Sequence, residues 1–546
     1  MIKMQLHYLC SGIILVGLLS FQKKANAVSV VDGPIGIYQW MVNLESIPSS
    51  QATSPLRAYL WIPPECKDIK GVVLACHNLQ EEGTMTHPDF RKAMTEMDFA
   101  EIWVTPGWNG IFDVKKGTQI AFEETLDKLA DVSGYSELRY APIVYMGHSA
   151  QASGPWHFGA WNPDRTLAMI SLHGDSPLSD FLCCNHINPD WEGIRNIDGI
   201  PGLVCIGEHE WMEERIRSSF VFQKNYPNST ISLLCDAGHW HNDISKRQID
   251  YLNTFIRKAF EQKMPVDWDG TKLVKLKKLN PEEGWLADRW HPEKMPTAVA
   301  ASYAKYKGDR DSAFWYFDEE MVRMTENYYV HERGKQHQYI NILQNAQFVS
   351  KEQEVIPFSP ETDGVTFHVK LAFTDSTGQQ LSDQHSVNPI LLQRISGPVE
   401  IVNDTTFRLK FYRAGVYDRR SGDIDIMAYS NPDDIYRRGW RRLALQVPLF
   451  QTDGTPQEIV FPEIENTKTD VGFVELNATA SSGLPVSYYI NGGPAIINGN
   501  KVLFLGIPPK AKYPIKVGVV AWQHGTTKGA LFQSAKPVER FFFIYK

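Results

Sequence analysis

The sequence predicts an α/β fold with a parallel sheet and crossover helices, followed by an all-β C-terminal region. The first observation is that short apolar runs alternate with helix-like segments between residues 37 and 262, the pattern of parallel strands joined by helices. The second is that valine-rich and aromatic strand patterns alternate with Gly, Pro, Asn and Asp turns beyond residue 350. This second pattern is typical of an immunoglobulin-like sandwich.

Eight apolar runs of strand length define the predicted sheet, and several are apolar throughout, as strands covered on both faces should be. They span residues 37–44, 56–62, 71–76, 100–105, 143–147, 167–172, 203–207 and 231–235. Helical segments are expected at 119–130, 150–160, 212–224 and 244–260. Asp243 is the expected N-cap of the last helix.

A chain of 546 residues is too long for one ordinary domain, because a single core rarely grows beyond roughly 250 to 300 residues. The changes of pattern divide it into an export signal (1–27), an α/β domain (28–262), a tryptophan-rich connector (263–350), a β-rich region (351–466) and a terminal β-sandwich module (467–546). Short helices are expected in the connector at 298–305 and 318–325, and terminal strands at 476–480, 486–490, 502–505, 515–521 and 538–544. Burial of the connector's large aromatic side chains should dock the β-rich parts against the α/β domain.

The N-terminus has the pattern of a cleaved export signal. Lys3 precedes an apolar stretch at 13–19, and Ala25 and Ala27 stand where a signal peptidase reads small residues. The apolar stretch is short for a membrane span, which needs about 20 residues, so no stable span is expected after cleavage. Cys10 precedes the stretch, where a lipid-attachment cysteine would follow it. We therefore expect a periplasmic or extracellular protein.

The composition excludes several partners and cofactors. A hydrophobic content of 43% with 22% charged residues is that of a soluble globular protein. The net charge of −8 comes without a basic run, so nucleic acid is not an expected partner. A glycine-rich phosphate loop is absent from the sequence, so no organic cofactor is implied. His239, His241 and Asp243, with His173 and Asp175, offer metal-ligand types, but we expect no metal site.

The cysteines that follow the signal have two settings. Cys76, Cys205 and Cys235 lie in apolar strand-like runs, where a free cysteine packs as a small hydrophobe. Cys183 and Cys184 are neighbours in a loop, and their pairing cannot be deduced from spacing.

Residues 143–152 form the clearest chemical motif, an apolar strand that leads into Gly147-His148-Ser149 and then a helix. A serine in such a turn presents its hydroxyl at the carboxyl end of the sheet, and the N–H of Ala150 can face a developing oxyanion. Gln151 departs from the usual pattern, which has a second glycine at that position. The strand, the glycine and the helix around Ser149 make this serine the candidate nucleophile.

A candidate acid and a candidate base follow two later strands, in the order Ser, acid, His. Glu210 lies three residues after Gly207 and is preferred to its rival Glu208. His239 follows a glycine directly after its strand and is preferred to His241. The histidine would accept the serine proton and return it to the leaving group, and the acid would fix the histidine's tautomer.

The second oxyanion donor should come from the loop after the 71–76 strand. The backbone N–H groups of Asn78 and Leu79 are the candidates, and an ordinary polar turn is the alternative.

Residues 28–262 resemble the α/β-hydrolase superfamily, on the strength of the Ser149 motif and the order of its partners. His77 resembles the histidine of the superfamily's His-Gly element, although Asn78 replaces the glycine. With the connector and the segment Ser481 to Tyr489, the chain looks like exported bacterial carbohydrate esterases of the acetyl or pectin methyl esterase type. The resemblance implies a Ser-His-Glu esterase acting on acetyl or methyl esters of plant or algal polysaccharides.

Aromatic residues near the proposed triad are weaker candidates for substrate binding. Trp156, Trp211 and Trp240 could line a saccharide site, or could equally fill the core above the sheet. Arg215 could bind a uronate carboxylate, with a surface ion pair as the alternative. Together with His77, these complete the candidate substrate-binding residues.

Two other functions stay open from the sequence. A serine peptidase or general esterase could use the same scaffold. A glycan-binding protein with an inactive hydrolase domain would fit the β-rich C-terminal part, although the intact Ser, Glu, His order counts against it.

Overall fold

The computed structural model describes residues 29–30, 36–46, 55–108, 112–179, 188–189, 196–290, 294–344, 346–351, 353, 355–418 and 420–546. The predicted export signal and the Cys183-Cys184 pair lie outside these residues. Cys76, Cys205 and Cys235 are fully buried free thiols, in keeping with core packing.

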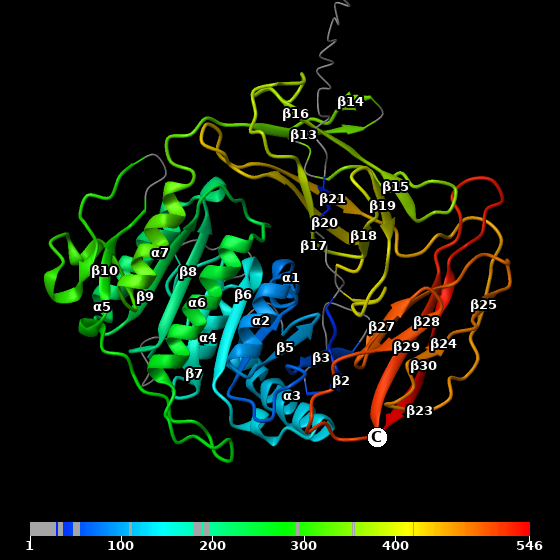
Figure 1. Cartoon of the computed structure of the whole chain (residues 1–546), viewed down its shortest axis with the longest axis horizontal. Coiled ribbons are helices and arrows are strands. Elements are labelled where there is room, and N and C mark those ends of the chain that lie inside the picture. The colour runs from blue at the N-terminus through cyan, green and yellow to red at the C-terminus, as the bar shows by residue number, and fades with distance from the viewer. Residues whose placement is uncertain are drawn as a thin grey trace, which may run out of the picture.

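An eight-stranded sheet forms the N-terminal domain, in the order β2-β3-β5-β4-β6-β7-β8-β9 (Figure 1). The strands are β2 (Trp40–Leu44), β3 (Leu56–Trp61), β4 (Gly71–Cys76), β5 (Phe99–Thr105), β6 (Ile143–His148), β7 (Thr166–Leu172), β8 (Pro201–Gly207) and β9 (Thr230–Asp236). β2, β3 and β5 pair antiparallel, and every pairing from β5 through β4 to β9 is parallel. This is an α/β sheet with a parallel core, as the sequence predicts, extended by two antiparallel strands at one edge.

Helices cover both faces of this sheet, because successive apolar side chains along a strand point to opposite faces and both faces must be buried. On β4, Val73 and Ala75 share a core cluster with Phe90 of α2, while Val72 and Leu74 share another with Phe122 of α3. The helices are α1 (Gln80–Met85), α2 (Pro88–Glu96), α3 (Thr118–Ser133), α4 (Gly154–Trp161), α5 (Glu213–Asn225) and α6 (Lys246–Lys263). None of the helices in the described residues is long and apolar enough to cross a membrane.

The structure differs from the helix predictions in two ways. It contains α1 and α2, which the sequence pattern does not predict. The N-cap of α6 is Ser245, whose hydroxyl accepts a hydrogen bond from the Gln248 N–H at 3.0 Å. Asp243 is not the cap, because its carboxylate is bound by Arg438.

The connector packs against β9, the edge strand. It contains β10 (Trp285–Asp288), β11 (Ala301–Ser302), β12 (Ala313–Tyr316) and α7 (Glu319–Val330). Tyr316 of β12 donates to the Leu233 carbonyl of β9 at 2.7 Å, and Trp290 and Trp315 are buried. The second predicted helix corresponds to α7, but the first is replaced by β11 and a short 3-10 turn.

The rest of the chain is all-β, as predicted, in two units. The middle β unit contains β13 (Tyr339–Gln344), β14 (Gln347–Phe348), β15 (Thr366–His368), β16 (Lys370–Thr374), β17 (Leu391–Ser396), β18 (Val399–Ile401), β19 (Thr406–Leu409), β20 (Asp423–Ser430) and β21 (Gly439–Gln446). Its sheets share one core. The short strand β1 (Ser29–Val30) pairs with β17.

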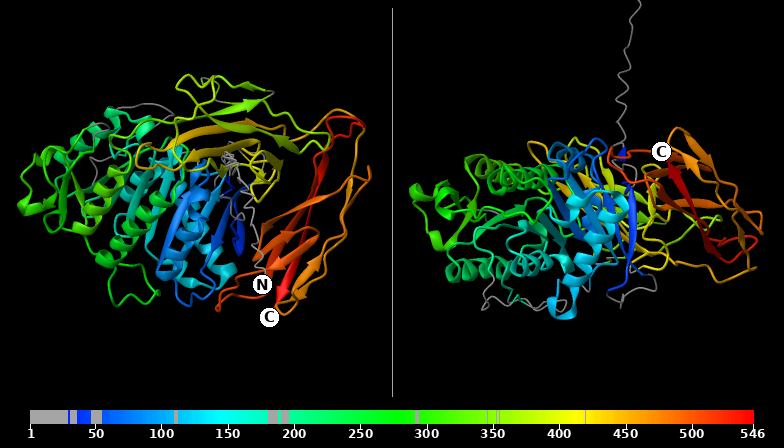
Figure 2. Two further views of the ribbon diagram at one scale, coloured as in Figure 1. Left: turned by 45° about the horizontal axis from the view of Figure 1, so that its top comes forward. Right: turned by 90° about the horizontal axis from the view of Figure 1, so that it is seen from below.

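The terminal β unit contains β22 (Ile459–Val460), β23 (Thr467–Lys468), β24 (Phe473–Glu475), β25 (Thr479–Ala480), β26 (Ser487–Gly492), β27 (Ala495–Asn498), β28 (Lys501–Phe504), β29 (Ile515–Gln523) and β30 (Ala535–Tyr545). Its two main sheets are β23-β30-β29-β26 and β24-β28-β27. Figure 2 shows it, in orange to red, beside the middle β unit. Tyr489 and Trp522 join the core of the middle unit, which fixes the contact between the two.

Buried ion pairs join the middle β unit to the α/β domain. Arg413 pairs with Glu82 of α1, Arg437 with Glu208 and Arg438 with Asp243. Every one of these side chains is at most 8% exposed. Since a buried charge without its partner is strongly unfavourable, these pairs specify how the two parts dock.

Arg438→Ala should lower the free energy of unfolding by about 3 to 5 kcal/mol, because it leaves the buried Asp243 carboxylate without its cation. Urea unfolding followed by circular dichroism measures the change. Arg323→Ala is the matched control, because Arg323 is 72% exposed and pairs with Glu319 on the surface of α7, where a pair contributes less than about 1 kcal/mol. Equal effects of the two substitutions would contradict the buried-pair account.

Candidate active site

Ser149 lies in a sharp turn between β6 and the helical segment that follows. Its φ of 53° is in the left-handed region, which non-glycine residues rarely adopt. The turn requires a glycine at position 147, because a Cβ there would lie 2.0 Å from the Gln151 carbonyl oxygen. Such strain at a serine after a strand is the geometry of a nucleophile elbow.

His241 connects Ser149 to Glu210. Its Nε2 lies 2.7 Å from Ser149 Oγ, and its Nδ1 lies 2.5 Å from Glu210 Oε2. The three side chains come from the carboxyl ends of β6, β8 and β9, which meet at one edge of the sheet. This arrangement lets a histidine take a proton from the serine while the carboxylate holds its other nitrogen.

The structure places His241, not the preferred His239, beside Ser149. The His239 ring is buried, with Nδ1 at 3.0 Å from Asp243 and Nε2 at 3.9 Å from Asp236. The chain turns at Gly238, with a φ of 78°. His239 is therefore directed into the protein, and the chain reaches Ser149 only two residues later.

The two glutamates after β8 have different partners. Glu210, the preferred acid, is held at Oε1 by the Gly207 N–H and by His173. Glu208 instead accepts from the Gly238 N–H at 2.7 Å and pairs with Arg437. Burial raises the pKa of Glu210, but His173 and His241 lower it more, so it lies well below its usual range. Glu210 is therefore an ionised acceptor.

His148 supports the backbone of the histidine loop, residues 236–243. Its Nε2 lies 2.7 Å from the His241 carbonyl oxygen, and its Nδ1 faces the Asn78 amide at 3.5 Å. Burial holds the pKa of His148 well below its usual value. A neutral ring then donates through Nε2 to the carbonyl and fixes the height of His241 above the sheet.

The predicted oxyanion donors at Asn78 and Leu79 are already engaged. Their N–H groups donate to Glu81 Oε2 at 3.2 and 2.9 Å, and the His148 N–H donates to its other oxygen at 2.9 Å. Burial raises the pKa of Glu81 to about 7, although these hydrogen bonds lower it. The prediction for these two amides is therefore not supported, and the Ala150 N–H, directly after the nucleophile, remains the candidate.

Two of the predicted substrate-binding residues are structural instead. Trp156 is 1% exposed, donates to the Asp175 carbonyl at 2.8 Å and packs over Gly202 of β8. His77 is 7% exposed, and its Nδ1 lies 2.9 Å from the Thr105 hydroxyl. Neither side chain is in position to contact a substrate at Ser149.

Trp211, Trp240 and Arg215 lie nearer the triad. Trp240 is partly exposed, with its ring 6.0 Å from His241 and stacked on Trp440 of the middle β unit. Trp211 is partly exposed and contacts Trp290. Arg215 forms a largely buried ion pair rather than a surface one, with Nε 3.5 Å from Asp175 and Nη1 4.0 Å from Glu210. Trp240 is thus the predicted aromatic residue whose ring contact with a triad member is established.

Residues of the middle β unit contribute to the site without any sign in the sequence, and His173, singled out only as a metal-ligand type, binds the triad acid instead. Asp425 of β20 accepts from the Asn242 amide at 3.2 Å and binds Arg442, whose guanidinium lies over Trp240. No local signal marks these residues, which lie about 180 to 200 positions from the loop that they contact. His173 follows β7 directly, and this position at the carboxyl end of a sheet strand was a usable signal.

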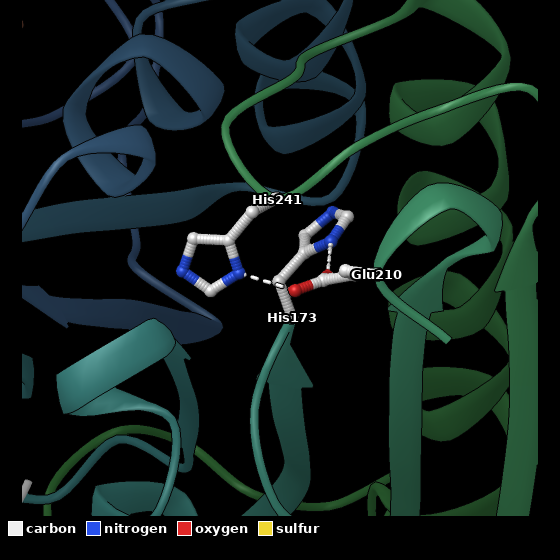
Figure 3. Close-up of side chains that lie close together, drawn as sticks. All are labelled: His173, Glu210 and His241. Carbon is white, nitrogen blue, oxygen red and sulfur yellow. Dashed lines mark hydrogen bonds and ion pairs between the residues drawn. The ribbon is translucent and has the colours of Figure 1, made fainter. Parts of the chain in front are cut away.

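Two groups of side chains in the described residues are close enough to share a cation. One is His173, Glu210 and His241, and the other is His173, Cys205 and Asp236. Both contain His173, whose two ring nitrogens already face Glu210 and Gln248. The geometry of the first group is accounted for by hydrogen bonds to one carboxylate (Figure 3).

Comparison with protein-family models and with curated proteins gives no match. Among solved structures, the chain is similar to Est1E from Butyrivibrio proteoclasticus, with 15% identity over 40% of this chain and 97% of that one and a TM-score of 0.28. An S-formylglutathione hydrolase from Agrobacterium tumefaciens shares 13% identity over 43% and 98%, with a TM-score of 0.30. The poly(3-hydroxybutyrate) depolymerase LpqC from Bordetella parapertussis shares 11% over 42% and 93%, with a TM-score of 0.29. Values at this level assign the chain neither a family nor an activity.

His241→Ala should lower kcat for an aryl acetate by about 10⁴-fold or more, because it removes the group that contacts Ser149 Oγ. His239→Ala should lower kcat far less, since the His239 ring faces Asp243 and Asp236 and not Ser149. Both are measured with thermal melts alongside, to separate loss of folding from loss of chemistry. The reverse ranking would restore His239 as the base.

Glu210→Gln should lower kcat on the order of 10³ to 10⁴-fold, because the amide cannot stabilise an imidazolium at His241. Glu208→Gln should mainly lower the melting temperature, because Arg437 then loses its buried partner. Steady-state kinetics and thermal melts of both variants test this. A larger fall in kcat for Glu208→Gln in folded protein would show that the acid has been misassigned.

Proposed function

We propose that this chain is an exported serine esterase that removes acetyl or methyl esters from plant or algal polysaccharides. The observation that supports ester hydrolysis is the hydrogen-bonded series from Ser149 Oγ through His241 to Glu210. The left-handed backbone of Ser149 adds support, since residues in strained backbone conformations cluster at active sites.

The geometry allows a two-step acyl transfer. Ser149 Oγ attacks the ester carbonyl while His241 Nε2 takes its proton, and the Ala150 N–H faces the oxyanion that forms. His241 then returns the proton to the leaving alcohol, which leaves an acyl group on Ser149. Water repeats the sequence and releases the acid. Glu210 stays ionised throughout and stabilises the imidazolium of His241.

The carbohydrate part of the proposal is supported by the resemblance of the whole chain to exported carbohydrate esterases and by Trp240. Its partly exposed ring lies beside His241 and stacks on Trp440, and aromatic rings in such a position can line a sugar site. Export is supported by the pattern of residues 1–27.

The deciding experiment is a product assay on acetylated xylan, methylated pectin and casein, with wild-type protein and the Ser149→Ala variant. We expect acetate or methanol from one of the polysaccharides with the wild type, and none above background with the variant. Release of new amino groups from casein without ester products would favour a peptidase. Equal ester release by both proteins would exclude a serine mechanism.

A further inference from the structure

His173 is a buried histidine that the proposed reaction does not use. It follows the last residue of β7 and has a φ of 51°, again in the left-handed region. Its backbone N–H donates to the Cys205 carbonyl of β8 at 2.7 Å. The side chain is 0% exposed, so it lies beneath the site and not at its surface.

The Glu210 carboxylate lies between two imidazoles. His173 Nδ1 is 2.5 Å from Oε1, and His241 Nδ1 is 2.5 Å from Oε2 (Figure 3). An ionised carboxylate only accepts hydrogen bonds, so His173 must carry a proton on Nδ1. Both oxygens of Glu210 are thereby held, and the carboxylate cannot rotate away from His241 without losing one of these charge-assisted contacts.

A second set of contacts fixes the tautomer of His173. Its Nε2 lies 3.2 Å from the Gln248 amide nitrogen. That amide is oriented by two further contacts, because its nitrogen donates to Asp236 at 2.8 Å and its oxygen accepts from Gln80 at 2.8 Å. Gln248 therefore presents a hydrogen to His173, whose Nε2 must accept it.

Burial is the largest influence on the pKa of His173 and lowers it, but the charge and hydrogen bond of Glu210 together with the charges of Asp236 and Asp243 outweigh it, so the net direction is upward. A second ring proton, on Nε2, would nevertheless point at the amide hydrogens of Gln248. The Asp236 carboxylate lies 3.7 Å from Nε2, too far to accept a hydrogen bond from it. The fully bonded arrangement is the neutral ring with its proton on Nδ1. Gln80, Gln248 and Asp236 are all 0% exposed, so water does not compete for these contacts.

We propose that His173 is a positioning residue of this active site, which fixes the Glu210 carboxylate against His241 by donating its Nδ1 proton to the second oxygen. The proposal rests on the proposed serine hydrolase function. Its physical consequence is twofold. First, Glu210 keeps one orientation. Second, because its carboxylate shares its charge with His173, it is a weaker base, so the proton taken from Ser149 stays on His241 during the reaction.

The test compares His173→Asn with His173→Gly. Asparagine and glycine both tolerate the left-handed backbone, but only asparagine carries an N–H group that can replace Nδ1–H. We expect His173→Gly to lower kcat for an aryl acetate by roughly 10 to 100-fold with KM nearly unchanged, and His173→Asn to recover most of that loss. His173→Ala provides the donor-free comparison if the glycine variant does not fold.

The pH profile of kcat/KM separates positioning from a packing role. Without the His173 donor, Glu210 keeps the Gly207 N–H and the nearby Arg215 but offers more of its charge to His241, so the acid limb of the donor-free variant should move to higher pH. An unchanged acid limb, or an asparagine variant as slow as the donor-free one, would overturn the proposal.

Fluorophosphonate labelling of the wild type distinguishes this inference from the proposed function. If the wild type is not labelled at Ser149, the serine hydrolase function itself fails. If it is labelled and turns over the ester, but the donor-free His173 variant is equally fast, only the inference about His173 fails.

Discussion

The position of His241 depends on a buried ion pair between parts of the chain that are far apart in sequence. Arg438 donates to both oxygens of Asp243, at 2.6 and 3.0 Å, and Asp243 lies two residues after His241. Asp243 is 0% exposed and is also approached by His239. A carboxylate buried so fully is tolerable only with its cation in place. The conformation of the histidine loop and the docking of the middle β unit are therefore coupled.

Two further buried ion pairs join the middle β unit to the α/β domain. Arg437 pairs with Glu208, which also holds the N–H of Gly238 in the histidine loop. Arg413 pairs with Glu82 of α1, next to the Glu81 that binds the loop after β4. Buried pairs add little net stability over apolar residues, but they discriminate sharply between docked arrangements. The middle β unit thus sets the geometry of loops that surround Ser149 without adding a member to the triad.

Much of this site could be read from the sequence, because the features concerned are local. The strands were found from continuous apolar runs, Ser149 from the strand, glycine and helix around it, and Glu210 from its spacing after β8. These signals lie within a few residues of the group they mark. The same is true of the all-β region, whose turns are marked by their own residues.

The errors arose where a side chain that the motif itself does not mark decides the outcome. His239 and His241 lie on one short loop, and the choice between them depends on the turn at Gly238 and on Arg438, which lies 195 positions after its partner Asp243. The amides of Asn78 and Leu79 were assigned to an oxyanion, but the Glu81 side chain folds back onto them. Trp156 was ambiguous because both core and site faces of a short helix can carry an aromatic residue, and its contact with Gly202 settles the matter.

The acid and the base are therefore supported from opposite sides. Glu210 is held from inside the α/β domain by His173, which follows β7, and through it by Gln248 of α6. His241 is held from outside, through Asp243 and Asn242, by Arg438 and Asp425 of the middle β unit. The triad residues all lie within the first 262 positions, yet some of the contacts that position His241, those of Arg438 and Asp425, do not. A domain boundary drawn from the location of the reacting side chains alone would separate the base from the groups that position it.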